Sequence, residues 1–240
     1  MRNALLLALL LGSSLMLCAD RVITPQPVAA WLFNGNTADA IDSLYATARD
    51  ITYAADRHGA PAAAAQFNGR GQWVQAPSLE AMIGDNPDGW SLVLWFKTDK
   101  PERSMTLFSD SGVRQMDFGY GMNLDITGGK VRFSLRGERY NDIADYNLHS
   151  SPIQAGQWHC VIAVANRAGG MASLYLDGQL SEQLNFYRAF DYIDDDPCQI
   201  GQRVWSGGQS MAFDGLIDDM RVFPEALDTS AVKFYSEIRP

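Results

Sequence analysis

The chain has 240 residues, of which 47% are hydrophobic and 20% are charged, and its formal net charge is −9. This length fits one large domain rather than several. The acidic balance argues against nucleic acid as a partner, because binding to nucleic acid relies on Lys and Arg side chains that neutralise phosphates. The same balance suits an exported protein in solution, or one that holds cations.

Residues 1–19 have the pattern of an export signal. Arg2 supplies a positive charge, and an apolar segment at 4–11 is followed by a second one at 15–17. These segments are too short and too close to the start of the chain to predict a membrane span, and acidic Asp20 comes next. The pattern therefore predicts a signal peptide that is removed on maturation.

Two cleavage sites fit this signal. The segment that ends at Cys18 resembles a bacterial lipoprotein signal, although Leu17 stands where such signals have a small residue. The alternative is cleavage after Ala19 by an ordinary signal peptidase. In both cases the protein is expected to be exported: periplasmic, associated with the outer membrane, or extracellular. Contact with a membrane is expected only through a lipid anchor on Cys18.

A short lead-in at 20–27 precedes a single domain at 28–238. Within this domain, segments typical of β-strands are separated by Gly, Asn, Asp and Pro. They lie at residues 28–33, 63–67, 72–75, 90–96, 107–108, 118–126, 130–135, 158–165, 172–176, 179–180, 198–200 and 213–223.

Tight turns and one helix complete the pattern. Asn68-Gly69 and Asp177-Gly178 are turn residues of the kind that join antiparallel strands. Residues 231–238 form the one predicted helix, with Asp228 or Thr229 as its N-terminal cap. Many short strands with a single terminal helix predict an all-β fold, a two-sheet antiparallel sandwich.

Tryptophans and cysteines lead to two expectations about the interior. The tryptophans in apolar segments are expected to fill the core between the sheets, because aromatic side chains dominate core burial; they are Trp31, Trp73, Trp95 and Trp158. In an oxidising compartment, Cys160 and Cys198 form an even pair. They are either joined in a disulfide or are two separate buried thiols.

Two adjacent carboxylates, Asp218 and Asp219, lie among apolar residues in the segment 213–223. Neighbouring side chains of a strand point to opposite faces, so at most one of the two is expected to face a given site. Burying an ionised carboxylate is costly unless it is paired, hydrogen-bonded or bound to a metal. The pattern therefore calls for a cation, an arginine or backbone amides near this strand.

Catalytic patterns are missing from the sequence. Retaining glycosidases need two carboxyl groups about 5 Å apart, and no Glu-x-Asp-x-x-Glu run places them on one strand. The histidines His58, His149 and His159 are scattered, with no nucleophile–base pair and no zinc spacing. The chain is therefore predicted not to be an enzyme.

The segment 185–197 mixes aromatic rings with four acidic residues. Rings with polar neighbours suit sugar recognition, because the apolar face of a sugar stacks on a ring while carboxylates accept hydrogen bonds from hydroxyls. Tyr187, Tyr192 and Trp205 are therefore predicted ligand-binding residues. The alternative is that aromatic residues of this segment cover one end of the sandwich, with the acids in solvent.

The order of several short motifs resembles a known family. The motifs are Trp31-Leu-Phe-Asn-Gly-Asn36, Asp56-Arg-His-Gly59, Ala65-Gln-Phe-Asn-Gly69, Ser91-Leu-Val-Leu-Trp-Phe-Lys97, Gly156-Gln-Trp-His159, Leu174-Tyr-Leu-Asp-Gly178 and Phe213-Asp-Gly-Leu-Ile-Asp-Asp-Met-Arg-Val-Phe223. Together they resemble the laminin-G-like, concanavalin-A-like jelly-roll domains of secreted bacterial proteins, over residues 28–238.

This resemblance implies a jelly-roll sandwich and a non-catalytic binding module that recognises carbohydrate or a glycoconjugate. The alternative is a protein–protein or structural module of an envelope or surface assembly, whose partner is a surface protein. A glycoside hydrolase or polysaccharide lyase of the same fold is the third reading.

The resemblance also implies a structural calcium ion, held between an early loop and the late strand. By matching position the ligands are Asn34, Asp39, Asp42 and Asp218, with Asp219 ranked behind Asp218. The loop departs from the family at Leu44-Tyr45, where Gly-Asn is usual, which puts Asp42 in question. The alternative is that Asp218 pairs with an arginine such as Arg57, while Asp39 and Asp42 are solvated turn residues.

Overall fold

The computed structural model describes residues 24–41, 44–84, 88–110, 121–139, 142–186, 196–203 and 211–238, with only the backbone for 137–139 and 142–144. The strands are β1 (Ala29–Trp31), β2 (Thr47–Arg49), β3 (Thr52–Ala54), β4 (Ala64–Asn68), β5 (Trp73–Gln75), β6 (Trp90–Lys97), β7 (Met105–Ser109), β8 (Gly121–Thr127), β9 (Lys130–Arg139), β10 (Asp142–Pro152), β11 (Trp158–Asn166), β12 (Met171–Leu176), β13 (Gln179–Asn185), β14 (Gln199–Ile200) and β15 (Asp214–Phe223). The helices are α1 (Leu79–Ile83) and α2 (Thr229–Glu237).

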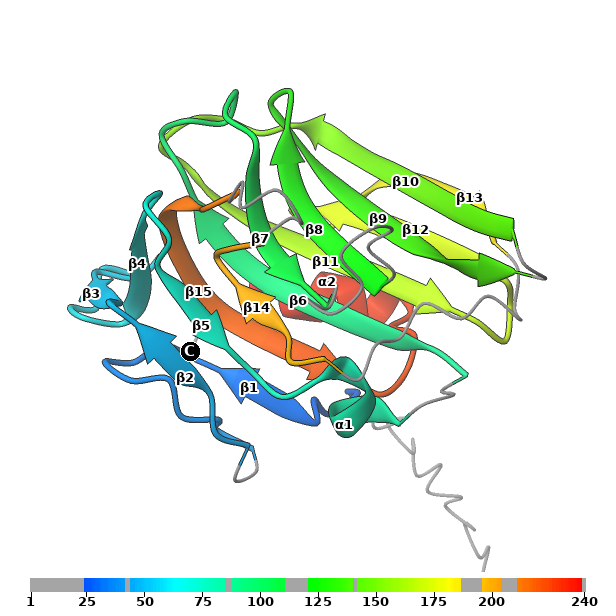
Figure 1. Cartoon of the computed structure of the whole chain (residues 1–240), viewed down its shortest axis with the longest axis horizontal. Coiled ribbons are helices and arrows are strands. Elements are labelled where there is room, and N and C mark those ends of the chain that lie inside the picture. The colour runs from blue at the N-terminus through cyan, green and yellow to red at the C-terminus, as the bar shows by residue number, and fades with distance from the viewer. Residues whose placement is uncertain are drawn as a thin grey trace, which may run out of the picture.

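The strands form two antiparallel sheets packed face to face (Figure 1). The eight-stranded sheet has the order β13-β12-β11-β6-β15-β4-β3, and β1 pairs with the second half of β15. The seven-stranded sheet has the order β10-β9-β8-β7-β14-β5-β2. This confirms the prediction of an all-β, two-sheet antiparallel sandwich.

The core lies between the two sheets and is set by strand alternation. On the seven-stranded sheet, residues in register across six strands are fully buried and belong to one apolar cluster; they are Leu148, Phe133, Leu124, Phe108, Ile200 and Val74. Leu92, Leu94 and Phe96 of β6 face them from the other sheet. Because successive side chains alternate between faces, every second residue of these strands points away from this core.

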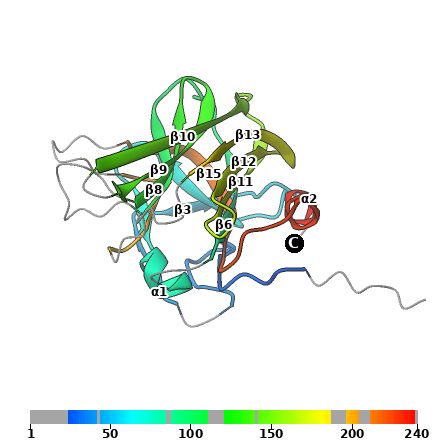
Figure 2. The same cartoon turned by 90° about the vertical axis from the view of Figure 1, so that its right-hand side faces the viewer.

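Helix α2 covers the outer face of the eight-stranded sheet (Figure 2). Its residues Ala231, Val232 and Tyr235 pack against a second apolar cluster on that face. Asp228 caps the helix, since its side chain accepts a hydrogen bond from the N–H of Ala231 at 2.8 Å. The predicted terminal helix and its cap at Asp228 are thus confirmed.

The prediction of a single helix was wrong, because α1 is a second one. Ser78 caps it by accepting from the N–H of Ala81, and its five residues are too few to show a helical period in the sequence. Neither of the two helices in the described part of the chain is long and apolar enough to cross a membrane. Strands β2, β3 and β10 were also missed; β2 is exposed throughout and so carries no apolar alternation.

The tryptophan prediction was right for Trp31 only. Trp31 is fully buried in the core, and so is Trp90, which was not predicted. Trp73 is only half-buried, on the outer face of the seven-stranded sheet, while Trp95 and Trp158 lie on the outer face of the eight-stranded sheet. The side chain of each of these three points away from the core between the sheets. Apolar neighbours in the sequence therefore did not indicate which face of the strand the tryptophan occupies.

Cys160 and Cys198 are both free and both buried, so the disulfide reading is corrected to two separate thiols. Cys160 lies on β11 in the cluster beneath α2, while Cys198 precedes β14 in the core of the opposite sheet. The sheet between these two clusters separates the two sulfur atoms. Spacing along the chain could not reveal this separation, because a disulfide depends on the distance between Cα atoms.

Candidate functional site

Asp218 and Asp219 both face the outer side of the eight-stranded sheet, contrary to the expectation from strand alternation. The register of β15 against β6 shifts between Asp218 and Arg221, so that β15 contains one residue more than β6. At this bulge Asp219 has a φ of 50°. A bulge with one residue in the left-handed region re-aims a side chain, and here it brings two carboxylates to one site.

Arg57 is the counter-ion of both carboxylates. Its guanidinium contacts Asp218 Oδ2 through NH1, and its NH2 lies 2.9 Å from Asp219 Oδ2. The guanidinium also lies 4.8 Å from the centroid of the Trp95 ring, and the Arg57 side chain is only 4% exposed. Arg221 completes the cluster with a bond from Nε to Asp219 Oδ1 of 2.6 Å. Two guanidinium groups therefore balance two carboxylates in a nearly dry environment.

Burial dominates the electrostatics of this cluster. It raises the pKa of Asp218 from 3.8 to about 6; Arg57 opposes the rise and the neighbouring Asp219 carboxylate adds to it. Such a shift means that the folded protein binds a proton at Asp218 more tightly than the unfolded chain does. The cluster is thus a buried ionic contact that joins the turn after β3 to β15.

The described donors do not fit a calcium ion shared by Asp39 and Asp218. Asp218 is engaged by Arg57, and Asp39 Oδ1 accepts hydrogen bonds from the N–H groups of Ala30 at 2.7 Å and Ile41 at 3.2 Å. Within the described ranges no group of three or more His, Cys, Asp or Glu side chains is arranged to hold a metal.

Asn34 is exposed in the loop after β1, and Asp42 lies outside the described residues. Calcium therefore stays a prediction of the resemblance. A melting curve recorded with and without a chelator tests it, since an ion that binds only the folded state raises the melting temperature.

A second polar feature crosses the outer face of the seven-stranded sheet. One side chain from each strand lies in register with the next, and all of them can both donate and accept hydrogen bonds. This polar row consists of Asn147, Ser134, Asn123, Ser109, Gln199, Gln75 and Thr47. With strands about 4.8 Å apart, the row is about 29 Å long.

The polar row has a buried floor and half-exposed flanks. Asn123, Ser109 and Ser134 are nearly buried, and Ser109 Oγ donates to Asn123 Oδ1 at 2.7 Å. Gln199 and Gln75 are half-exposed. The side-chain oxygen of Gln199 is buried without a hydrogen-bond partner among the described residues, which leaves one acceptor of the row unsatisfied.

Trp73 lies on the same face as the polar row, two residues before Gln75 on β5. Its half-exposed ring supplies an apolar surface beside the hydrogen-bonding groups. Sequence reasoning missed this site, because the row is assembled from single residues of seven strands. The available signal was the alternation within each strand, which places Trp73 and Gln75 on one face and Val74 on the other.

Next to the polar row, the buried carboxylate of Asp125 is fully engaged. Its Oδ1 accepts from Thr106 Oγ1 at 2.7 Å, and its Oδ2 lies 2.7 Å from NH2 of Arg132. Arg203 approaches the same oxygen at 3.9 Å. A carboxylate held in this way is a structural counter-ion of the two arginines.

The predicted ligand residues Tyr187, Tyr192 and Trp205 all lie outside the described residues. Along the chain, the segment 187–195 leads toward β14, and the segment 204–210 follows Arg203. The three residues therefore stay predictions.

A family model matches residues 68–233, and its description is the concanavalin A-like lectin/glucanases superfamily. The chain belongs to this superfamily. The resemblance inferred from the motifs is thereby confirmed, and the concanavalin A-like fold agrees with the two packed sheets. No curated protein sequence matches the chain.

Solved structures with a similar fold include receptor-binding domains of botulinum neurotoxins. The receptor-binding domain of botulinum neurotoxin C/D mosaic serotype has a TM-score of 0.66 at 14% identity, covering 88% of this chain and 51% of that one. The binding domain of Paraclostridial Mosquitocidal Protein 1 has a TM-score of 0.66 at 12% identity, covering 87% of this chain and 51% of that one. The chain thus spans about half the length of these structures, and the likeness concerns the fold.

Proposed function

We propose that this concanavalin A-like domain is an exported, non-catalytic module that binds carbohydrate or a glycoconjugate along the polar row. The observation that carries the proposal is the accessible end of this row, where Gln199, Gln75 and Thr47 lie in register on the face of Trp73. Sugar hydroxyls both donate and accept, and the amides and hydroxyls of the row match them. Membership of a superfamily that includes lectins supports the same reading.

The proposal assigns specific roles to Trp73 and Gln199. The half-exposed Trp73 ring provides a stacking surface for the apolar face of a sugar, and the half-exposed side chain of Gln199 places an amide group beside it on the same face. A short oligosaccharide fits the accessible end of the row, at Gln199, Gln75 and Thr47, because Asn123, Ser109 and Ser134 are nearly buried.

Binding without catalysis is proposed because the described part of this face offers no free pair of carboxylates. The oxygens of Asp125 are taken by Thr106 and Arg132, and Asp145 accepts from Asn147 at 3.0 Å at the sheet edge. Glycoside hydrolysis needs one carboxyl group as acid and another as nucleophile or base. Turnover of a polysaccharide by the purified protein would overturn this part of the proposal.

A glycan array followed by titration calorimetry tests the proposal. The Trp73→Ala and Gln199→Ala variants are expected to lower the affinity for the best array ligand by about tenfold each, which is about 1.4 kcal/mol. Gln179→Ala, at an exposed position of β13 on the other sheet, is the matched control and is expected to bind normally. A blank array, or equal affinity for all variants, contradicts carbohydrate binding at this face.

One observation favours the protein-binding alternative. The edge strand β2 is exposed throughout, and nearby Ile41 and Tyr45 are 53% and 83% exposed. An open edge with apolar neighbours can accept a strand from another protein. A stoichiometric envelope partner that is lost on Tyr45→Ser, together with a blank array, would decide for this alternative.

A further inference from the structure

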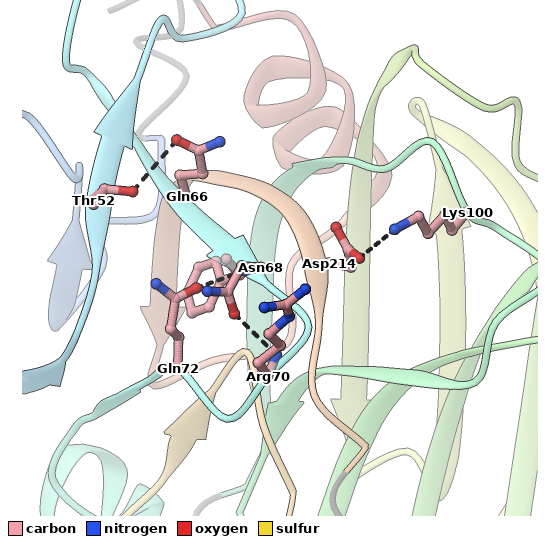
Figure 3. A pocket seen from close by; sticks show the side chains of 8 residues that line it. Thr52, Gln66, Asn68, Arg70, Gln72, Lys100 and Asp214 are labelled. Carbon is pink, nitrogen blue, oxygen red and sulfur yellow. Dashed lines mark hydrogen bonds and ion pairs between the residues drawn. The ribbon is translucent and has the colours of Figure 1, made fainter.

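An open cavity of about 480 Å³ lies at one end of the sandwich, where the β3–β4 hairpin meets the start of β15 (Figure 3). Its volume is in the range of small-molecule sites. The residues that line it are Thr52, Gln66, Phe67, Asn68, Arg70, Gln72, Lys100 and Asp214. It is separate from the polar row, since Gln66, Asn68 and Asp214 belong to the eight-stranded sheet.

Positive charge exceeds negative charge around this cavity. Lys100 Nζ lies 2.6 Å from Asp214 Oδ2, and NH1 of Arg103 lies 3.4 Å from the same oxygen. The guanidinium of Arg70 has no hydrogen bond or ion pair with any described residue, and Figure 3 shows it extending from its turn between Asn68 and Asp214. Three cations thus meet one carboxylate, in a chain whose overall charge is −9.

The amide side chains of the cavity present donors rather than acceptors. Gln66 Oε1 accepts from Thr52 Oγ1 at 3.4 Å, and Asn68 Oδ1 accepts from the N–H of Arg70 at 3.0 Å. Gln72 Oε1 accepts from the N–H of Asn68. Their oxygens are therefore used within the protein, and the NH2 groups of Gln66 and Asn68 remain to bond a ligand. A site with positive charge and spare N–H donors selects an anionic acceptor.

Hydrogen bonds of Arg103 and Thr98 to the backbone hold the segments of the cavity together. NH2 of Arg103 donates to the carbonyl oxygen of Gly69 at 3.0 Å, which ties it to the turn that carries Arg70. Thr98 Oγ1 donates to the carbonyl oxygen of Asp214 at 2.7 Å and also accepts from the N–H of Lys100 at 3.1 Å. The donors thus come from three chain segments that are bonded to one another, so the charge is organised before a ligand arrives.

We propose that this cavity binds the sulfate, phosphate or carboxylate group of an acidic saccharide, with Arg70 and Lys100 as the charged contacts. The anion chemistry follows from the cavity alone, and only the choice of a saccharide rests on the proposed function. The acidic charge of the whole chain repels long polyanions, so a short ligand with a localised charge fits best.

Titration calorimetry of the mature protein at low salt tests the inference with four probes. They are a sulfated glycosaminoglycan tetrasaccharide, the same tetrasaccharide after desulfation, inorganic sulfate and an acidic peptide. The sulfated tetrasaccharide is expected to bind at least tenfold more tightly than its desulfated form, with weaker binding at higher salt because salt screens the contact. Equal affinity for the two tetrasaccharides, or no binding of the sulfated one, overturns the proposal.

Variants locate the site. Arg70→Gln is expected to weaken binding of the sulfated probe at least tenfold without unfolding the protein, because Arg70 is exposed. Lys233→Gln, which removes the same charge from an exposed position of α2, is the matched control and should bind normally. Asp214→Asn removes the competing carboxylate and is expected to tighten binding several-fold, an effect that misfolding cannot produce. Equal weakening by Arg70→Gln and Lys233→Gln contradicts a localised site.

The outcomes separate this inference from the proposed function. Binding of the sulfated probe that depends on Arg70 but not on Trp73 assigns it to this cavity. If inorganic sulfate or the acidic peptide binds as tightly as the saccharide, the anion site is upheld, but the choice of a saccharide as its ligand is overturned. Neutral glycans that bind through Trp73, with no effect of Arg70→Gln on any probe, uphold the proposed function and overturn the cavity.

Discussion

Arg57 carries the positive charge that allows Asp218 and Asp219 to be buried together. The sequence required a partner for a carboxylate on this strand, and Arg57 was one of the candidates. What the sequence did not indicate is that one guanidinium serves both acids, since alternation placed them on opposite faces. Trp95 beneath the guanidinium adds a cation–π contact, so the arginine is held by both charge and packing.

Removing Arg57 is expected to be costly. Among the described residues, Arg57→Gln leaves Arg221 as the one guanidinium beside the two carboxylates. Breaking a buried ion pair lowers the free energy of unfolding by about 3–5 kcal/mol. Urea denaturation measures the change. Arg49→Gln, at a side chain that is 64% exposed, should change stability by less than about 0.5 kcal/mol. Similar stability of Arg57→Gln and wild type would show that the cluster is not a stabilising contact.

The raised pKa of Asp218 sets the sign of a pH dependence. A carboxyl group whose pKa is higher in the folded state favours folding below its unfolded pKa of 3.8, and this contribution is lost as pH rises through about 6. Between pH 7 and pH 5, wild type should therefore gain about 1 kcal/mol relative to Asp218→Asn, which cannot titrate. Urea denaturation of both proteins at the two pH values gives the difference. If the difference in unfolding free energy between wild type and Asp218→Asn does not change with pH, the raised pKa of Asp218 is ruled out.

At the scale of elements, local distortions decide where side chains point. The bulge on β15 turns Asp219 toward Arg57, and Gly201, directly after β14, accepts a hydrogen bond from the N–H of Phe213 at 2.8 Å. Gly201 has a φ of 80°, and a Cβ at this position would lie 2.2 Å from Cε1 of Phe67. A side chain is therefore excluded here both by backbone conformation and by the close approach of a core ring.

Gly201→Ala separates these two effects when compared with Gly59→Ala. Gly59 also has a positive φ, of 85°, but no atom lies within 4 Å of the position that a Cβ would take there. Both variants lose about 1–2 kcal/mol to the left-handed conformation. Gly201→Ala is expected to lose about 1–3 kcal/mol more, because the methyl group overpacks against Phe67. Thermal or urea denaturation of the two variants measures this difference in stability. Equal losses would argue against a close contact between position 201 and Phe67.

On the scale of the whole molecule, the sandwich separates two apolar layers. One lies between the sheets and the other lies beneath α2, and each contains one buried cysteine. Burial raises the pKa of the Cys160 thiol well above its ordinary value, which keeps it protonated and unreactive. Burial thus protects both thiols from reagents in the solvent.

Thiol titration checks this arrangement. In the folded protein neither Cys160 nor Cys198 should react with a thiol reagent on the timescale of minutes, while both should react after unfolding in denaturant. A reducing agent should leave the melting temperature unchanged, since no disulfide is present to break. Mass spectrometry that finds Cys160 and Cys198 linked would contradict the two-layer arrangement.

The sequence by itself determined the fold class, the main strands, the capped terminal helix and the family. These features rest on local periodicity, on turn residues and on short motifs. The residues of each such pattern lie close together in the sequence. It also identified Asp218 as a carboxylate that needs a partner. The facing side of Trp73 and Trp95, the free state of the cysteines and the common face of Asp218 and Asp219 were decided only by the tertiary structure.

The physical reason is that these features depend on contacts between distant segments. Arg57 meets Asp218 across 161 positions of the chain, and the polar row takes one residue from each of seven strands. Register shifts such as the bulge at Asp219 are fixed by packing of the two sheets, and a shift of one residue reverses the face of every side chain beyond it. Local patterns therefore specified which elements form, while the packing of sheet on sheet specified which residues share a site.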